Sequence, residues 1–213
     1  MSDAVKVKTS TAEKTSRVEK RRLTRRRIVA AAADLFLDQG YGATTLDQVA
    51  ARAGVAVQTV YFHFGNKATL LKEALDVAAV GDDEPVALLE RPWLDELRAE
   101  PDSRRMVALW VAYSVTIYAR IGPIMQVVRA AAVTDPEMAA QWATNETQRA
   151  TAFRAMAELL AERGGLNRPV DEAVDVLCAL LGPEVYDVLT GRGWTAQRWE
   201  RFTVESITAA LLG

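Results

Sequence analysis

Apolar residues recur at three- and four-residue steps along most of the chain, a spacing that places them on one face of an α-helix. In the first part of the sequence the pattern predicts four helices separated by glycines. They are expected over 22–39, 45–53, 57–64 and 67–80. Later helices are expected near 93–99, 103–121, 123–133, 136–163, 170–189 and 195–212. Because alternating β-branched runs are scarce, the chain is predicted to be all-α.

The helical pattern divides the chain into three parts. Residues 1–20 are rich in Lys, Thr, Ser, Ala and Glu without a period, which indicates a flexible basic tail. Residues 21–81 hold the first four helices, and residues 82–213 form a larger second domain. The acidic run Asp82-Asp83-Glu84-Pro85 is the expected boundary between the two domains.

The charge distribution supports this division. The net charge of the chain is −2. Residues 1–80 carry 13 Lys and Arg against 8 Asp and Glu, whereas residues 81–213 carry 13 against 20. This asymmetry indicates a basic module that binds a polyanion. The basic module is joined to an acidic module that does not bind one.

Composition excludes several classes of function. The single cysteine, Cys178, excludes an internal disulfide and is expected to be a small core residue. The single histidine, His63, removes chemistry that needs two imidazoles, and no metal or cofactor site is expected. The chain has no phosphate-cradling glycine loop, so an enzyme is not expected. No apolar run approaches the ~18–20 residues of a membrane span, and the N-terminus is unlike a secretory signal, so we expect a cytoplasmic protein without membrane contact.

Two of the short helices have the features of a helix-turn-helix. Thr45 and Gln48 have the spacing of a capping box. Ala50 is small where the helix over 57–64 must cross closely, and Gly54 can adopt the positive φ that reverses the chain. The residues left exposed on the next helix include groups that can meet base edges or phosphates. They are Val57, Gln58, Thr59, Tyr61 and His63.

This segment resembles the DNA-binding domain of the tetracycline-repressor (TetR) family of transcription regulators. The resemblance covers about 22–80 and depends on the Ala53-Gly54-Val55 turn, the Tyr61-Phe62-His63-Phe64 helix end and the Lys67 that opens the next helix. It implies a three-helix DNA-binding domain followed by a larger α-helical domain for ligand binding and dimerisation. Many members have Ser-Lys-Gly or Ser-Pro-Ala where this chain has Ala56-Val57-Gln58, which reduces the hydrogen-bonding groups available for base readout.

The expected DNA contacts combine the recognition helix with the preceding basic run. Gln58 and Thr59 are expected to reach base edges, and Thr45, Tyr61, His63 and Lys67 to hold phosphates. The full set of predicted DNA-binding residues is Thr44, Thr45, Val57, Gln58, Thr59, Tyr61, His63, Lys67, Arg25 and Arg26. Each of the two segments has an alternative interpretation without DNA contact. In the first, the Tyr-Phe-His-Phe run packs in the core. In the second, the arginines at 21, 22, 25, 26 and 27 form only a solvated helix face.

The second domain contains a candidate ligand site. Asn145 and Arg149 interrupt an otherwise apolar stripe on the helix over 136–163, and buried polar groups need partners. The partner is either an acid on a neighbouring helix or a ligand in an aromatic-walled cavity. The predicted ligand-binding residues are Trp110, Tyr113, Trp142, Asn145, Arg149, Phe153 and Met156.

The last two predicted helices carry more apolar surface than a terminal hairpin needs. In the resembled family this pair forms a dimer interface, and twofold dimers are the commonest oligomers. The predicted interface residues are Leu177, Leu181, Val185, Trp199 and Phe202. The sequence therefore predicts a homodimeric repressor that leaves a palindromic double-stranded DNA operator when a small hydrophobic effector binds. The alternative is a DNA-binding regulator of the same fold without a small-molecule inducer.

Overall fold

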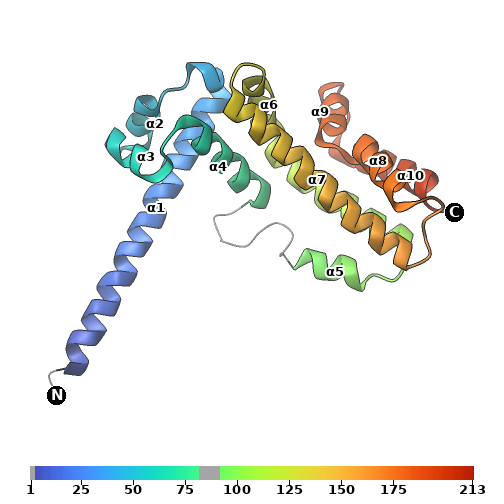
Figure 1. Cartoon of the computed structure of the whole chain (residues 1–213), viewed down its shortest axis with the longest axis horizontal. Coiled ribbons are helices and arrows are strands. Elements are labelled where there is room, and N and C mark those ends of the chain that lie inside the picture. The colour runs from blue at the N-terminus through green and yellow to red at the C-terminus, as the bar shows by residue number, and fades with distance from the viewer. Residues whose placement is uncertain (1–2, 82–91) are drawn as a thin grey trace. The chain divides into compact units, whose positions relative to one another are not determined.

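The computed structural model describes residues 3–81 and 92–213, and these residues form helices with no strand beyond one isolated bridge between Leu166 and Leu212 (Figure 1). The all-α prediction is confirmed. The helices are α1 (Asp3–Ala43), α2 (Leu46–Ala53), α3 (Val57–Phe64), α4 (Lys67–Val80), α5 (Trp93–Ala99), α6 (Ser103–Ala132), α7 (Pro136–Glu162), α8 (Val170–Leu181), α9 (Pro183–Gly191) and α10 (Ala196–Leu211).

The chain divides into two compact units, Met1–Ala74 and Leu75–Gly213. The division falls inside α4, so this helix begins in the first unit and ends in the second. The sequence placed the boundary later, at the acidic run over 82–85, which lies outside the described residues. Composition changes at that run, whereas the division into compact units follows packing, and the last turns of α4 pack with the second unit.

The first helix is longer than its apolar stripe. Its backbone is helical from Asp3, so the prediction of a flexible tail over 1–20 is wrong. Neither Gly nor Pro occurs before Gly40, and Ala, Lys, Glu and Arg favour the helix even where no apolar face requires it. Gly40 has φ 80° and ψ 171°, outside the helical region, which confirms it as the residue that interrupts α1.

Two prolines act differently from what the sequence predicts. Pro123 lies inside the continuous helix α6, where a break was expected. Ile121, Ile124 and Met125 are all buried around it, and this packing offsets the backbone hydrogen bond that proline removes. Conversely, the helix expected over 170–189 is divided at Gly182, and Pro183 opens α9 because a first-turn proline needs no N–H partner.

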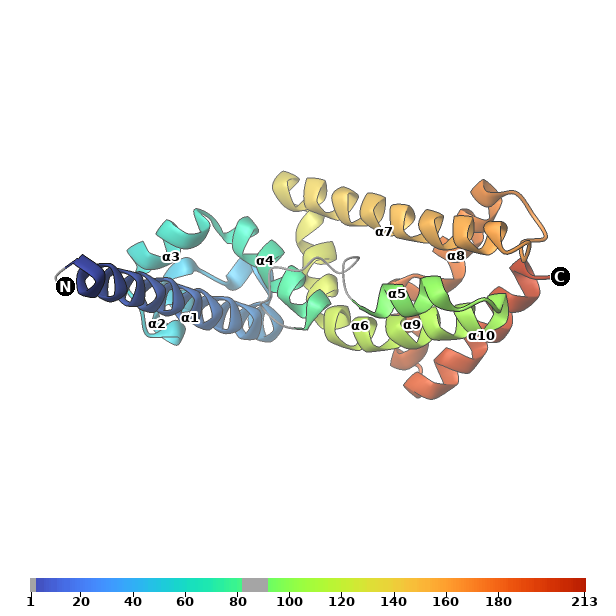
Figure 2. The same cartoon turned by 90° about the horizontal axis from the view of Figure 1, so that it is seen from below.

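Helix α6 is long and apolar enough, by length and composition alone, to cross a membrane, which the sequence analysis did not recognise. It is also the central helix of the second unit. It packs against α7, α9 and α10, and its buried side chains include Met106, Val107, Trp110 and Val111. Burial within the chain therefore accounts for part of its apolar composition. Figure 2 shows α6 and α7 as the long helices of this unit.

An aromatic cluster fixes α9 and α10 against α6. Trp199 is fully buried, and its ring meets those of Tyr118 at 5.9 Å and Tyr186 at 5.2 Å in edge-on geometry. The Tyr118 hydroxyl donates a 2.5 Å hydrogen bond to the carbonyl of Leu181 at the end of α8. Burial raises the pKa of Tyr118 well above its usual value, so this hydroxyl keeps its proton as a donor.

Replacing Tyr118 with Phe should lower the free energy of unfolding by about 1–3 kcal/mol, because the Leu181 carbonyl loses its donor in a dry environment. Urea unfolding should show a lower midpoint at an unchanged slope. Tyr61→Phe, which removes a hydroxyl from a residue that is 52% exposed, is the matched control and should leave the midpoint unchanged. Equal midpoints for the two variants would contradict the assigned role of the Tyr118 hydroxyl.

Candidate nucleic-acid interface

The turn between α2 and α3 is set by a cap at each end of α2. The Thr45 hydroxyl accepts a hydrogen bond from the Gln48 N–H, and the Gln48 side chain accepts one from the Thr45 N–H, so the predicted capping box is confirmed. At the other end, Gly54 has φ 65° and its N–H is bonded to the carbonyls of Ala50 and Ala51. A side chain would strain this left-handed conformation, which explains the glycine.

A small core fixes the crossing of α2 and α3. Val49 and Val60 have no exposed surface, Ala50 is 3% exposed and Phe64 is 4% exposed. The short Ala50 side chain allows the backbones of the two helices to approach. Because Val60 and Phe64 lie one turn apart on the buried side of α3, the residues between them face outward.

The outward side of α3 is polar and aromatic. Gln58 is exposed, Tyr61 is 52% exposed and Phe62 is 71% exposed, whereas Thr59 and His63 are half-buried. The structure therefore leaves all the predicted recognition-helix residues at least partly accessible, Val57 included. Phe62 was missed by the sequence analysis, although its position two residues from both Val60 and Phe64 places it opposite the buried side.

Arginines of α1 lie against the end of α3. The guanidinium of Arg21 lies 5.2 Å from the centroid of the Phe62 ring, and that of Arg25 lies 4.8 Å from the Phe64 ring. Partial burial and the positive charges of Arg21 and Arg25 lower the pKa of His63. These surroundings therefore favour the neutral imidazole of His63, whose N–H can donate to a phosphate.

Arg25 and Arg27 of the basic run contact neighbouring helices. Arg25 forms a 2.7 Å ion pair with Glu73 of α4. Arg27 donates hydrogen bonds to the carbonyls of Ala53 and Gly54 and so ties α1 to the turn of the helix-turn-helix. Arg26 is exposed. Part of the basic run therefore positions α2, α3 and α4. The run is more than a solvated helix face and more than a source of charge for DNA contacts.

Two of the predicted DNA-binding residues have hydrogen-bond partners within the chain. Thr44 is 1% exposed, and its hydroxyl donates to the Gly40 carbonyl at 2.8 Å, so its side chain closes the interrupted end of α1. The Lys67 ammonium donates to the carbonyls of Tyr41 and Thr44 at 2.7 and 3.0 Å and lies over the Tyr41 ring. The sequence motif alone does not reveal these contacts. Because Gly40 interrupts the helix, nearby carbonyls lack partners within the helix and need other donors.

The comparisons with known proteins agree with this geometry. The model for bacterial regulatory proteins of the tetR family matches residues 28–74, which run from α1 into α4. The transcriptional regulator SrpR of Pseudomonas putida is 46% identical over 52 residues, 24% of each chain. The first unit therefore contains a domain that matches the TetR family. The chain spans only 24% of the length of SrpR and 39% of the length of TtgW, another Pseudomonas putida regulator.

Longer but weaker matches extend across the second unit of the chain. The uncharacterised regulator YdeS of Bacillus subtilis is 26% identical over 171 residues, 78% of each protein. Among solved structures, NalD of Pseudomonas aeruginosa, the secondary repressor of the MexAB-OprM multidrug efflux pump, has a TM-score of 0.66 at 22% identity over 91% of this chain and 98% of that one. Bacillus subtilis FadR in complex with stearoyl-CoA has a TM-score of 0.68 at 16% identity over 86% and 97%. These structures show a shared fold.

The predicted ligand residues fall into two groups. On α6, Trp110 is 6% exposed and packs with Tyr113 around Trp93, a residue that the sequence analysis did not select. The Tyr113 hydroxyl donates to Glu96 at 2.6 Å, and this hydrogen bond raises the pKa of Tyr113. On α7, Phe153 and Met156 are buried, whereas Trp142, Asn145 and Arg149 are half-buried.

The two polar residues of α7 have different surroundings. Arg149 pairs with Glu184 of α9 at 3.1 Å and with Glu146 at 3.6 Å, so the acid on a neighbouring helix, one of the two expected alternatives, is present. The Asn145 carbonyl oxygen accepts from Gln141, whereas its buried amide nitrogen has no hydrogen-bond partner in the structure. Only Asn145 therefore presents an unsatisfied donor.

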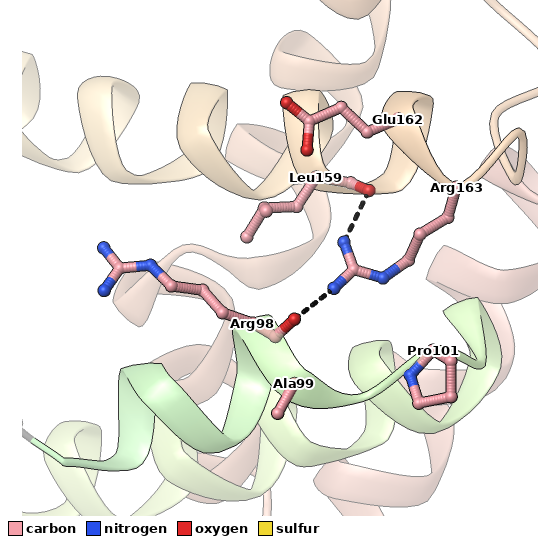
Figure 3. Close-up of a pocket in the computed structure, with 6 residues that line it drawn as sticks. All are labelled: Arg98, Ala99, Pro101, Leu159, Glu162 and Arg163. Carbon is pink, nitrogen blue, oxygen red and sulfur yellow. Dashed lines mark hydrogen bonds between the residues drawn. The ribbon is translucent and has the colours of Figure 1, made fainter.

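One pocket in the second unit, of about 500 Å³, lies elsewhere (Figure 3). It is lined by Arg98, Ala99, Pro101, Leu159, Glu162 and Arg163. The Arg163 guanidinium donates to the carbonyls of Arg98, Glu100 and Leu159, so it joins the end of α7 to the segment after α5. None of the predicted ligand residues lines this pocket, and Arg163, one of its two arginines, already holds three carbonyls of the chain.

The predicted interface residues also fall into two groups, one buried within the chain and one accessible. Leu177, Leu181 and Trp199 have no exposed surface within a single chain, so they form its own core and the prediction that they contact a partner is wrong. Periodicity marks apolar faces but does not distinguish a core from an interface. Val185 is half-buried and Phe202 is 39% exposed, so both remain accessible. Cys178, predicted to be buried, is exposed on α8.

Gln58→Ala should weaken binding to the preferred duplex by about 1–3 kcal/mol and leave binding to random duplex nearly unchanged, because a base-edge contact carries sequence information. Competition titrations with labelled duplexes measure both quantities. Gln148→Ala, at an exposed position of α7, is the control and should change neither. An unaltered sequence preference for Gln58→Ala would remove Gln58 from the readout.

Lys67→Met tests whether the ammonium holds protein carbonyls or phosphates. If it holds the carbonyls of Tyr41 and Thr44, the substitution should lower the free energy of unfolding by about 1–3 kcal/mol. Thermal and urea unfolding without DNA measure this. Unchanged stability, combined with a salt dependence of DNA binding that is shallower by about one unit, would instead assign Lys67 to a phosphate.

Proposed function

We propose that this TetR-family protein is a cytoplasmic, DNA-binding transcriptional repressor without enzymatic activity, which binds a palindromic operator as a homodimer and leaves it when a small hydrophobic ligand binds. The observation that carries the proposal is the outward side of α3. There a polar and aromatic surface is held rigidly by a buried core and flanked by arginines of α1.

Electrostatics and shape both support DNA as the partner. An α-helix fits the major groove of B-form DNA, where Gln58 and Thr59 can bond with base edges. Exposed Arg17, Lys20 and Arg26 lie on α1, the helix that also flanks the end of α3 through Arg21. Such charges supply sequence-independent affinity through phosphate contacts and counterion release.

A homodimer is supported by apolar side chains left exposed on the last helices. Val188 is 59% exposed on α9, and Phe202 is 39% exposed on α10, where it packs edge-on against Trp194. A twofold axis through this surface would present two recognition helices to DNA. Half-sites would then form an inverted repeat with centres about one helical turn, or a small multiple of it, apart.

A ligand is supported chiefly by Asn145. A buried N–H without a partner costs free energy that a bound acceptor would recover. Trp142 lies on the same helix three residues earlier and is half-buried. We propose that Asn145 fixes the polar end of an apolar ligand, whereas Arg149 serves mainly to join α7 to α9. The FadR structure, which shares this fold, holds stearoyl-CoA, a ligand with a long apolar acyl chain and a polar CoA end, and this supports the proposal.

The second candidate function is a DNA-binding regulator without an inducer. It is favoured by the Arg149–Glu184 ion pair and by the complete burial of Met156, since both features stabilise α7 without a ligand. The two candidates differ in one measurable property: only the first gives a ligand-dependent change in operator affinity.

The proposal is tested by selecting duplexes from a random pool with the full chain and sequencing the bound fraction. An enriched inverted repeat supports sequence-specific binding by a dimer. Enrichment of no sequence, or of a single half-site without symmetry, would contradict the proposal. The selected duplex then serves as the operator in the experiments that follow.

Val188→Glu should convert the dimer into a folded monomer, because it places a charge in the proposed apolar interface. Sedimentation measures the mass, and operator affinity should fall at least tenfold because only one half-site is held. The control is Val133→Glu, which adds the same charge at a residue that is 83% exposed at the end of α6. A wild-type chain that sediments as a monomer at micromolar concentration would contradict the dimer.

Asn145→Leu should abolish the melting shift caused by apolar compounds that stabilise the wild-type chain, and it should leave operator affinity intact. Gln148→Leu, at an exposed position on the same helix, is the control and should keep the shift. For the wild type, linkage requires that a compound which weakens operator binding tenfold is itself weakened tenfold by operator, about 1.4 kcal/mol. Equal compound affinities with and without operator would favour the regulator without an inducer.

A further inference from the structure

We propose that Trp199 and Thr203 of α10 form a binding site for an uncharged small molecule, whose hydrogen-bond-accepting oxygen is held by both side chains. The inference goes beyond the proposed function, because it assigns a second polar anchor, separate from Asn145 of α7, and its test needs no DNA. It is carried by two buried donors, by the direction of the Thr203 hydroxyl and by the uncharged, aromatic surroundings of both residues.

Buried side-chain atoms without a hydrogen-bond partner are concentrated on α10. Among the residues that the structure describes, they are Trp199 Nε1, Thr203 Oγ1 and Thr208 Oγ1 of α10, and Asn145 Nδ2 of α7. Trp199 and Thr203 have no exposed surface, and they lie one turn apart on the same face of the helix. Each unmatched donor costs free energy that a bound acceptor recovers.

The Thr203 hydroxyl does not use the acceptor that its own helix offers. A helical Ser or Thr often donates to the carbonyl four residues earlier. Thr144 of α7, Thr190 of α9 and the buried Ser114 of α6 do so at 2.8–2.9 Å. Thr203 makes no such hydrogen bond to the carbonyl of Trp199 within the described part of the chain. Its hydroxyl is therefore available to a group outside its own helix.

The chemistry of the two side chains selects an oxygen acceptor. The indole N–H of Trp199 can only donate, and the Thr203 hydroxyl can donate as well. A carbonyl oxygen has two lone pairs, so one ligand oxygen can accept both hydrogen bonds. A ketone or an ester therefore matches the pair, whereas a group that only donates leaves the indole without a partner.

The surroundings disfavour a charged oxygen. The buried side chains of α10 are Trp199, Thr203, Ile207 and Leu211, and none of these four carries a charge. Burial also raises the pKa of Tyr118, whose ring lies 5.9 Å from that of Trp199, so this region of the core favours the neutral form of an oxygen. A carboxylate would find no countercharge on this face of α10, and the ligand is therefore uncharged.

Aromatic rings of two other helices surround the indole of Trp199. Tyr118 of α6 and Tyr186 of α9 meet it edge-on at 5.9 and 5.2 Å. The Tyr118 hydroxyl already donates to the Leu181 carbonyl, so the polar anchor is left to Trp199 and Thr203. Aromatic walls with a few convergent polar groups are typical of small-molecule sites. Because both donors are buried, a ligand reaches them through local opening of the contacts between α10 and α6.

The test uses two uncharged probes of nearly the same shape, acetophenone and α-methylstyrene, which differ in having a carbonyl oxygen or a methylene group at one position. Each is titrated into the full chain, and the assigned indole N–H signals of its five tryptophans are followed by NMR. The wild type should bind acetophenone about fivefold more tightly than α-methylstyrene, with a saturable shift of the Trp199 signal. Equal affinities, or no shift of that signal with acetophenone, would overturn the proposal.

Thr203→Val removes the hydroxyl at nearly constant volume and should act in opposite directions on ligand binding and on stability. Acetophenone affinity should fall about fivefold, and α-methylstyrene affinity should stay unchanged. The thermal midpoint without ligand should rise, because an apolar methyl replaces a buried hydroxyl that has no partner. Thr208→Val is the matched control: Thr208 is half-buried on the same helix, and its hydroxyl is also unpartnered in the described part of the chain, but it lies on another face. It should keep the wild-type affinity for acetophenone.

A lower thermal midpoint of Thr203→Val without ligand would also contradict the proposal, because the hydroxyl would then already be satisfied, for example by an internal water. Asn145→Leu should keep the acetophenone shift of the Trp199 signal. Failure of the Asn145 anchor can therefore be distinguished from failure of this site. Loss of the shift in Asn145→Leu would show that the two anchors are not separate and would overturn the inference.

Discussion

The burial of Val60 and Phe64 on one side of α3 is the constraint on which the rest of the candidate site depends. These two residues fix the rotation of an eight-residue helix, and an isolated helix of that length has little stability of its own. Once they are buried, Gln58, Tyr61 and Phe62 are directed outward by the 3.6-residue period. The turn at Gly54 and the small side chain of Ala50 allow the crossing that buries them. The proposed base readout therefore depends on this packing.

The basic run of α1 has a double role that charge counting does not reveal. Arg27 satisfies carbonyls of the helix-turn-helix turn, and Arg25 joins α4 to the end of α3, whereas Arg26 lies exposed. A surface ion pair is usually worth little. Here the geometric consequence matters more than the free energy, because these side chains determine the relative positions of the three helices that form the candidate interface.

The sequence predicted the parts of the fold that local rules determine. The capping box at Thr45, the turn at Gly54 and the all-α class depend on short-range periodicity and backbone conformation, and the structure confirms them. Tertiary packing decided the rest. Burial around Pro123 keeps α6 continuous. Leu177, Leu181 and Trp199 are buried in the core of the chain. Thr44 and Lys67 donate hydrogen bonds to carbonyls near Gly40. No local pattern distinguishes an apolar residue of the core from one of an interface.

The central claim is that the outward side of α3 meets the major groove of the operator. A photo-crosslinking amino acid at position 58 of the full chain tests it most directly, with the same amino acid at the exposed position 148 of α7 as the control. The account predicts crosslinks from position 58 to bases within each half-site of the selected duplex, and none from position 148. Crosslinks from position 148 but not from position 58 would contradict the account, because they would place the DNA contact outside α3.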